Sequence, residues 1–200
     1  MLRTGDQYRD TLRDGREVWV DGKKVQDVPS HPVFKPIVDI RARIYDMAHE
    51  AQFSQQLTYI DETSGEKNCI GSKLPKTKSD WLSKRQAIKT IMYEIGAVVT
   101  RVGDETVGEM WSLYDGTDIL NKVDPRFGDN IANHIQKVLE SDTFHVSGNT
   151  DPKGDRSKLP QDQDSDMLLH AVEETDKGIV VRGAKSVSYT HLTLPTILLV

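Results

Sequence analysis

The chain has 200 residues, a formal net charge of −5 at pH 7 and 36% hydrophobic residues. This length is sufficient for one large or two small domains with a hydrophobic core. The negative charge disfavours a nucleic-acid partner, whose phosphates require clustered Lys and Arg, and no run of about 18 apolar residues predicts a membrane span.

The first predicted elements are a hairpin and a helix. Asp21-Gly22 lies within the β-prone segment 18–25, and this pair readily adopts the positive φ angles of a tight hairpin. Pro32 suits the first turn of a helix, and apolar residues recur at helical spacing as far as Ala48. We therefore expect a small hairpin, followed by a helix from Pro32 to about Glu50.

The next segment is a loop that leads into the strongest helix signal of the chain. Residues 57–76 are rich in Gly and Ser, which predicts a loop with a loose hairpin. Thr77 and Asp80 then have the spacing of a capping box. The apolar stripe that follows contains Trp81, Ile88, Ile91, Met92, Ile95 and Val99.

Two further helices complete the helical part. A shorter apolar stripe begins at Val107 and ends near Asp115-Gly116, and Asp124-Pro125 begins a helix that continues through Leu139. We expect residues 1–142 to form an N-terminal helical domain with a small β-hairpin.

The character of the sequence changes after Asp142. A polar, turn-rich stretch over residues 149–166 precedes the hairpin pattern of Leu168–Val172 and Ile179–Val181. We expect residues 143–186 to begin a β-domain. The predicted fold class is therefore mainly α with a β segment, that is, α+β.

The last segment, residues 187–200, is apolar and does not continue the preceding alternation of polar and apolar residues. It is similar to translated sequencing-adapter sequence. We therefore expect a non-native tail and leave it out of the fold prediction. The alternative is a genuine terminal strand.

Two features indicate the cellular compartment. The opening residues, Met1–Asp6, lack the apolar region of a secretory signal. Cys69 is the only cysteine, so the chain can form no internal disulfide and no multi-cysteine metal site. We expect a cytoplasmic protein without a metal.

Two stretches carry the motifs of a known family. The first contains Arg3-Thr4-Gly5, Leu12–Trp19 and His31-Pro32. The second contains His145-Val146, Asp155–Lys158 and Glu174–Lys185. In this order along residues 3–185, they resemble the oxygenase component of the 4-hydroxyphenylacetate 3-monooxygenase (4-hydroxyphenylacetate 3-hydroxylase) family.

The resemblance implies a fold similar to that of acyl-CoA dehydrogenases, with an N-terminal helical domain, a middle β-domain and a C-terminal helical bundle. Family members are much longer than this chain. We therefore expect a truncated N-terminal piece that contains the first domain and the start of the second. By itself it should be inactive and should bind flavin poorly or not at all.

The resemblance also implies an activity. In the family a flavin reductase supplies reduced FAD (FADH2), which reacts with O2 and delivers oxygen to the ring carbon ortho to a phenolic hydroxyl. The protein positions the small aromatic substrate and excludes water. A homo-oligomer is implied for the full-length protein.

Three residues fall at positions of the family's substrate site, and two of them match the family residue. Arg101 matches an arginine that contacts the phenolic oxygen, where a guanidinium stabilises phenolate charge. His145 matches a histidine between substrate and flavin, which can exchange a proton near neutral pH. Glu105 replaces a family tyrosine, and an ionised carboxylate cannot donate a hydrogen bond. We therefore expect a different aromatic substrate, with an amine or cationic group that Glu105 or Asp104 pairs with.

A loop of the second stretch matches the segments that hold FAD. Backbone groups of a turn and a basic side chain suit the isoalloxazine edge and the pyrophosphate. The cofactor-binding residues that the resemblance implies are His145, Lys153, Gly154, Asp155, Arg156, Leu159, Pro160, Gln161 and Asp162.

Each of these residues also has a purely structural interpretation. Arg101 could neutralise the dipole at a helix C-terminus, and His145 could be a half-buried structural histidine. Without the resemblance, Lys153–Asp164 is a charged loop. Four other histidines and three stripe residues are interpreted as structural: His31, His49, His134, His170, Trp81, Met110 and Trp111.

Three other functions remain as alternatives. The acidic residues Asp104, Glu105 and Glu109 could form a hydrolytic or metal site, although a solvated first helical turn explains them. The chain could also be an inactive helical piece that only associates with other subunits. A dehydratase of the same superfamily needs cysteines for an iron–sulfur cluster, and Cys69 alone does not supply them.

Overall fold

The computed structural model describes residues 2–97, 104–145, 148, 150–155, 157–176 and 178–185, with the backbone alone at residues 104–109. The chain divides into two compact units, Met1–His145 and Val146–Val200. The predicted domain limits of 1–142, 143–186 and 187–200 stay a prediction, and the tail lies outside the described residues.

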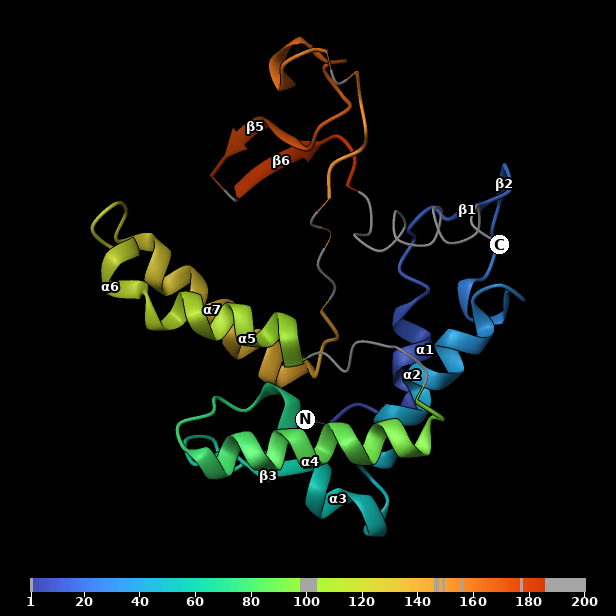
Figure 1. Ribbon diagram of the computed structural model, residues 1–200, viewed down its shortest axis with the longest axis vertical. Helices are drawn as coiled ribbons and strands as arrows, with labels where there is room; N and C mark the ends of the chain where they lie inside the picture. The colour runs from blue at the N-terminus through green and yellow to red at the C-terminus, as the bar shows by residue number, and fades with distance from the viewer. Residues whose placement is uncertain are drawn as a thin grey trace. The chain divides into compact units, whose positions relative to one another are not determined.

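The first unit is mainly helical (Figure 1). Its helices are α1 (Gly5–Thr11), η1 (Val28–Ser30), α2 (Lys35–Met47), α3 (Ala51–Leu57), η2 (Ile70–Ser72), α4 (Lys78–Glu94), α5 (Asp104–Asp115), α6 (Thr117–Leu120) and α7 (Arg126–Ser141). Its strands are the antiparallel pairs β1 (Trp19–Val20) with β2 (Lys23–Lys24) and β3 (Thr58–Ile60) with β4 (Lys67–Cys69).

The second unit contains a hairpin of β5 (His170–Thr175) and β6 (Gly178–Arg182), with the short 3-10 helix η3 (Pro160–Asp162) before it. This confirms the predicted hairpin. Gly183 has a φ of 119° and passes so close to Leu168 that an added Cβ would lie 2.3 Å from the Leu168 carbonyl oxygen. A larger residue there would separate the two ends of the hairpin.

The start of the second helix differs from the prediction. A 3-10 turn and a further turn occupy residues 28–34, so α2 begins at Lys35 rather than at Pro32. Pro36, not Pro32, fills the first helical turn, where the missing N–H of a proline costs nothing. The helix ends at Met47. The following helix α3 was not predicted.

The beginning of α4 follows its capping signal. Thr77 Oγ1 accepts from the Asp80 N–H at 3.2 Å, and the Asp80 carboxylate accepts from the Thr77 N–H at 2.8 Å. The predicted capping box is confirmed. The helix ends at Glu94, before Gly96 and Ala97 at φ of 70° and 56°, so the predicted extension to Val99 was wrong.

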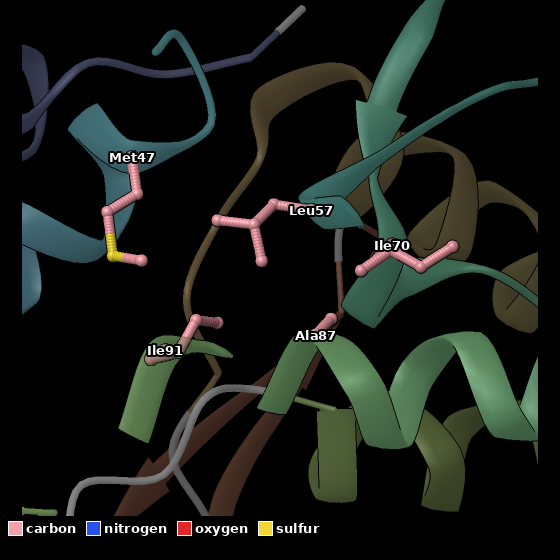
Figure 2. Close-up of a cluster of buried hydrophobic side chains, with 5 residues drawn as sticks. All are labelled: Met47, Leu57, Ile70, Ala87 and Ile91. Carbon is pink, nitrogen blue, oxygen red and sulfur yellow. The ribbon is translucent and has the colours of Figure 1, made fainter. Parts of the chain in front are cut away.

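The core of this unit lies where α2, α3, η2 and α4 meet, and Figure 2 shows its five buried side chains. They are Met47, Leu57, Ile70, Ala87 and Ile91. Lys84 shares the buried face of α4, and its Nζ donates to the carbonyls of Gly71 and Lys73 at 2.8 and 2.9 Å. Trp81 is 61% exposed, so its prediction as a core residue was wrong: it lies in the first turn, before the buried part of the face begins.

The end of α7 is tied to the start of the chain by contacts that we call the Asp142 clasp, made by Arg3, Tyr45, Ser141 and Asp142. Asp142 adopts the left-handed conformation at φ 47° and ψ 46°. Its carboxylate accepts from the Arg3 N–H at 3.0 Å, and its carbonyl accepts from the Tyr45 hydroxyl at 3.1 Å. The Arg3 guanidinium donates to the Ser141 carbonyl at 2.8 Å. The clasp therefore fixes the direction in which the chain leaves α7.

The clasp makes stability depend on pH. Burial raises the pKa of the Asp142 carboxyl, partly opposed by the Arg3 hydrogen bond. A raised folded-state pKa means that unfolding becomes easier as pH rises from the ordinary Asp value of about 3.9 through the folded value. Asp142→Asn keeps the acceptor and tolerates the left-handed backbone. We predict that it is more stable than wild type at about pH 7, and equal to it at about pH 3.

Urea denaturation at the two pH values measures this difference. Asp21→Asn is the matched control, because Asp21 also has a positive φ of 49° but is exposed in the β1–β2 turn. It should change stability little at either pH. An Asp142→Asn variant less stable than wild type at neutral pH would contradict the prediction.

Candidate functional site

Three of the predicted site residues, Arg101, Glu105 and Arg156, lie partly or wholly outside the described residues. Arg101 falls between α4 and α5 along the chain, beyond the described ranges. α4 ends at Glu94, and α5 begins at Asp104. Glu105 lies in the first turn of α5, and its side chain is not described. Their roles stay predictions.

His145 is described, and it follows α7 in irregular backbone. We expected His145 at the start of a strand, and this stays a prediction because residues 146 and 147 lie outside the described ranges; among the described residues, the next strand is β5. The left-handed turn at Asp142 reverses the chain, so that residues 143–145 run back beside α7. The His145 ring lies 5.5 Å from the ring of His134 on α7, at an interplanar angle of 75°.

The residue before His145 is held by α2. The guanidinium of Arg41 lies over the Phe144 ring, 3.7 Å from its centroid, and Arg41 is only 5% exposed. A buried cation over an aromatic face is a strong contact, because little water competes with it. It restricts Phe144 and, through the backbone, the position of His145.

The surroundings of His145 favour its neutral form. Burial lowers the pKa of the imidazole, the positive charge of His134 lowers it further, and the Thr143 carbonyl opposes both effects. The His145 Nδ1 atom lies 3.1 Å from the Thr143 carbonyl oxygen, which can only accept. Nδ1 therefore carries the proton in the neutral ring, and Nε2 is left as an acceptor.

The predicted cofactor loop belongs to the second unit and forms a tight turn. The Asp155 carboxylate accepts from the Ser157 N–H and hydroxyl at 3.0 and 2.7 Å, and the Lys158 N–H donates to the Asp155 carbonyl at 3.1 Å. Arg156 lies outside the described residues. Leu159 precedes η3, which contains Pro160, Gln161 and Asp162.

The donors of this loop fit the pyrophosphate of FAD. The side chains of Lys153 and Lys158 are exposed, and within the described part of the chain neither makes an ion pair. The described N–H groups of the turn already have acceptors within the loop, so the exposed ammonium groups are the donors that suit a phosphate. His145 belongs to the first unit and the loop to the second, and each is formed by contacts within its own unit.

The neighbours of His145 could not be found from the sequence. Arg41 and His134 lie far from it along the chain, and only the reversal at Asp142 brings them near. Within the described ranges, no three His, Cys, Asp or Glu side chains are grouped as metal ligands would be. No helix in those ranges has both the length and the apolar character needed to cross a membrane.

A helical unit followed by the beginning of a β-region is the arrangement of the acyl-CoA dehydrogenase-like fold class, as predicted. Residues 4–198 match the family described as "4-hydroxyphenylacetate 3-hydroxylase N terminal". The chain belongs to this family. The match extends through residue 198 and so includes most of the predicted tail, residues 187–200. That this tail is non-native stays a prediction.

Known relatives agree with this assignment. The 4-hydroxyphenylacetate 3-monooxygenase oxygenase component of Thermus thermophilus is 30% identical over 187 residues, which are 92% of this chain and 38% of the relative. The FADH(2)-dependent monooxygenase TftD of Burkholderia cepacia is 31% identical, over 93% of this chain and 37% of the relative. The chain thus spans less than two fifths of either relative.

Solved structures show the same similarity. The oxygenase component HpaB of 4-hydroxyphenylacetate 3-monooxygenase, complexed with FAD and 4-hydroxyphenylacetate, matches with a TM-score of 0.79 and 30% identity. That match covers 92% of this chain and 38% of the HpaB chain.

A dehydratase is also among the relatives. The 4-hydroxybutyryl-CoA dehydratase/vinylacetyl-CoA-Delta-isomerase of Clostridium aminobutyricum is 28% identical, over 98% of this chain and 42% of the relative. Family membership alone therefore does not decide between hydroxylation and dehydration.

The His134–His145 contact gives a prediction about titration. We expect the His145 imidazole to titrate below the ordinary value of about 6.5, and its midpoint to move upward in His134→Asn, because the variant lacks the neighbouring positive charge. An NMR titration of the ring nitrogens measures both midpoints. His31→Asn, on η1's C-terminal side, should leave the His145 midpoint unchanged. A wild-type midpoint above the ordinary value would contradict this account.

Proposed function

We propose that this chain is part of the oxygenase component of a two-component, FADH2-dependent monooxygenase that hydroxylates a phenol-type aromatic compound at the ortho carbon. The observation that carries the proposal is the similarity of this chain, in fold and at 30% sequence identity, to HpaB complexed with FAD and 4-hydroxyphenylacetate. The family match over residues 4–198 agrees with it.

The described residues suit two tasks in this reaction, and Arg101, which lies outside them, is proposed for a third. Bound reduced FAD would supply the chemistry that activates O2. The exposed ammonium groups of Lys153 and Lys158 would hold the pyrophosphate. His145, neutral with a free Nε2, would accept the phenolic proton. Arg101 would then stabilise the phenolate with fixed donors.

The substrate is proposed to differ from 4-hydroxyphenylacetate. Glu105 stands in the first turn of α5, where the family has a tyrosine, and an ionised carboxylate repels an anionic substrate. We propose an aromatic substrate with an amine or another cationic group, which Glu105 or Asp104 pairs with. The partners proposed with it are O2 and a flavin reductase.

Four further properties belong to the same proposal. The working protein is proposed to be cytoplasmic and a homo-oligomer. The helical domain is proposed to end near Asp142, where the β-domain begins. Because the chain spans 38% of its Thermus thermophilus relative, it is proposed to be inactive by itself.

Dehydration is the second candidate, and the state of Cys69 argues against it. An iron–sulfur cluster needs several thiolates, and Cys69 is the only cysteine of the chain. Burial raises the pKa of its thiol to about 12, so the free thiol stays protonated at neutral pH. An inactive piece that only associates with other subunits is the remaining alternative.

A chimeric enzyme tests the proposed function. Residues 3–185 of this chain replace the matching segment of the Thermus thermophilus relative, and the chimera receives chemically reduced FAD, O2 and a panel of phenols. We predict ortho-hydroxylated product by mass spectrometry. We also predict that Arg101→Met and His145→Asn each lower kcat/KM by about 100-fold, the usual contribution of an electrostatic or acid–base group.

The controls separate chemistry from folding. Arg85→Met removes an exposed arginine of α4 and should leave kcat/KM unchanged. In the panel, phenols bearing an amine should be preferred over carboxylated ones. A folded chimera that makes no hydroxylated product would refute the hydroxylase assignment, and a preference for anionic phenols would refute the role of Glu105.

A further inference from the structure

The side chain of Gln163 forms three hydrogen bonds with the backbone of the predicted cofactor loop. Its Oε1 accepts from the Asp155 N–H at 3.0 Å, and its Nε2 donates to the Asp155 carbonyl at 2.6 Å and to the Lys158 carbonyl at 3.2 Å. One amide group thus satisfies both backbone groups of Asp155 and one of Lys158. We call these three hydrogen bonds the Gln163 clamp.

The clamp acts on backbone that no strand or helix supports. The described residues 153–155, 157 and 158 lie in turns and irregular structure, where buried or half-buried N–H and carbonyl groups need partners from side chains. Within the turn itself, the Lys158 N–H and the Asp155 carboxylate supply the other bonds. The conformation of the turn is therefore set jointly by Asp155 and Gln163.

A second contact fixes how closely the loop approaches the clamp. A Cβ added to Gly154 would lie 2.3 Å from Met167 Cε and 2.5 Å from Gln163 Oε1. Only glycine permits this approach without displacing those side chains. The loop therefore packs closely against Gln163 and Met167 at Gly154. The side chains of Lys153 and Lys158 remain exposed.

We propose that Gln163 is a positioning residue for flavin binding: its amide holds Asp155 and Lys158 in the turn conformation that presents the ammonium groups of Lys153 and Lys158 to the FAD pyrophosphate. This inference rests on the proposed function, since it takes FAD as the ligand. Gln163 itself touches only the loop. Its effect on FAD is therefore indirect, through the order of the turn.

The order of the turn can be measured without flavin. Amide hydrogen exchange of the whole chain, followed by NMR, should show a protected Asp155 N–H in wild type. In Gln163→Leu, which keeps the size of the side chain but removes its polar groups, exchange at Asp155 should become about tenfold faster. Gln26→Leu makes the same change at an exposed position and should have no effect on Asp155.

A charge variant provides a rescue that a purely steric effect would not show. In Gln163→Glu, the carboxylate still accepts from the Asp155 N–H, but its other oxygen faces the carbonyls of Asp155 and Lys158. When this carboxyl is protonated, it can donate to one of them. Protection of Asp155 relative to wild type should therefore recover as the pH is lowered. In Gln163→Leu it should not.

Binding is measured by titrating FAD into the chimera with the Thermus thermophilus relative and following the flavin fluorescence. We expect about tenfold weaker binding when the chimera carries Gln163→Leu than when it carries Gln163, with recovery in Gln163→Glu at low pH. Unchanged exchange at Asp155 in Gln163→Leu would overturn the clamp. Faster exchange with unchanged FAD affinity would overturn the positioning role.

Failure of the proposed function has a different signature. If the folded chimera that carries Gln163 binds no FAD at any concentration, the assignment of FAD to this loop is overturned, and with it the ligand that the inference names. The exchange rates of wild type and Gln163→Leu would then still show whether Gln163 orders the turn.

Discussion

The left-handed turn at Asp142 determines where the described part of the candidate site begins. α7 could not continue past Ser141, because the Asp142 carbonyl accepts from Tyr45 and its carboxylate accepts from the Arg3 N–H. The chain therefore turns back, which brings Phe144 over Arg41 and His145 against His134. The position of the imidazole therefore depends on the contacts of the residues just before it: those of Asp142 with Arg3 and Tyr45, and that of Phe144 with Arg41.

This arrangement has an energetic cost. The carboxyl of Asp142 is buried enough to raise its pKa, and a raised carboxyl pKa means that the charged form destabilises the fold at neutral pH. The hydrogen bonds from Arg3 and Tyr45 offset part of this cost. A protein that keeps such a group gains a defined direction for the following segment.

The two described pieces of the site are built on the same principle. His145 and the Asp155–Lys158 turn both lie in irregular backbone, and side chains from elsewhere fix them: Arg41 and His134 in one case, Gln163 in the other. Loops that carry binding residues need such support, because their own backbone provides few hydrogen bonds. The same physical arrangement thus suits a proton acceptor and a phosphate-binding turn.

Local chemistry explains which elements could be predicted from the sequence. The Thr77–Asp80 capping box and the Asp21-Gly22 turn are set by neighbouring residues, and both form as expected. The prediction that Trp81 is a core residue was wrong, because its burial depends on which part of α4 contacts the core.

Tertiary contacts explain the rest of the site. His145 itself lies in irregular backbone, after a reversal of the chain at Asp142 that the distant Arg3 and Tyr45 fix. For the same reason no spacing in the sequence could reveal the contacts of His134, or the three hydrogen bonds of Gln163.

The central claim is that the guanidinium of Arg101 and the imidazole of His145 serve one phenolic oxygen. The most direct measurement is an NMR search for nuclear Overhauser effects between the side-chain protons of Arg101 and the ring protons of His145, in the chain labelled at arginine and histidine. The account predicts cross-peaks between the two side chains. Cross-peaks from His145 to His134 and Phe144, with Arg101 in contact only with other parts of the molecule, would contradict it.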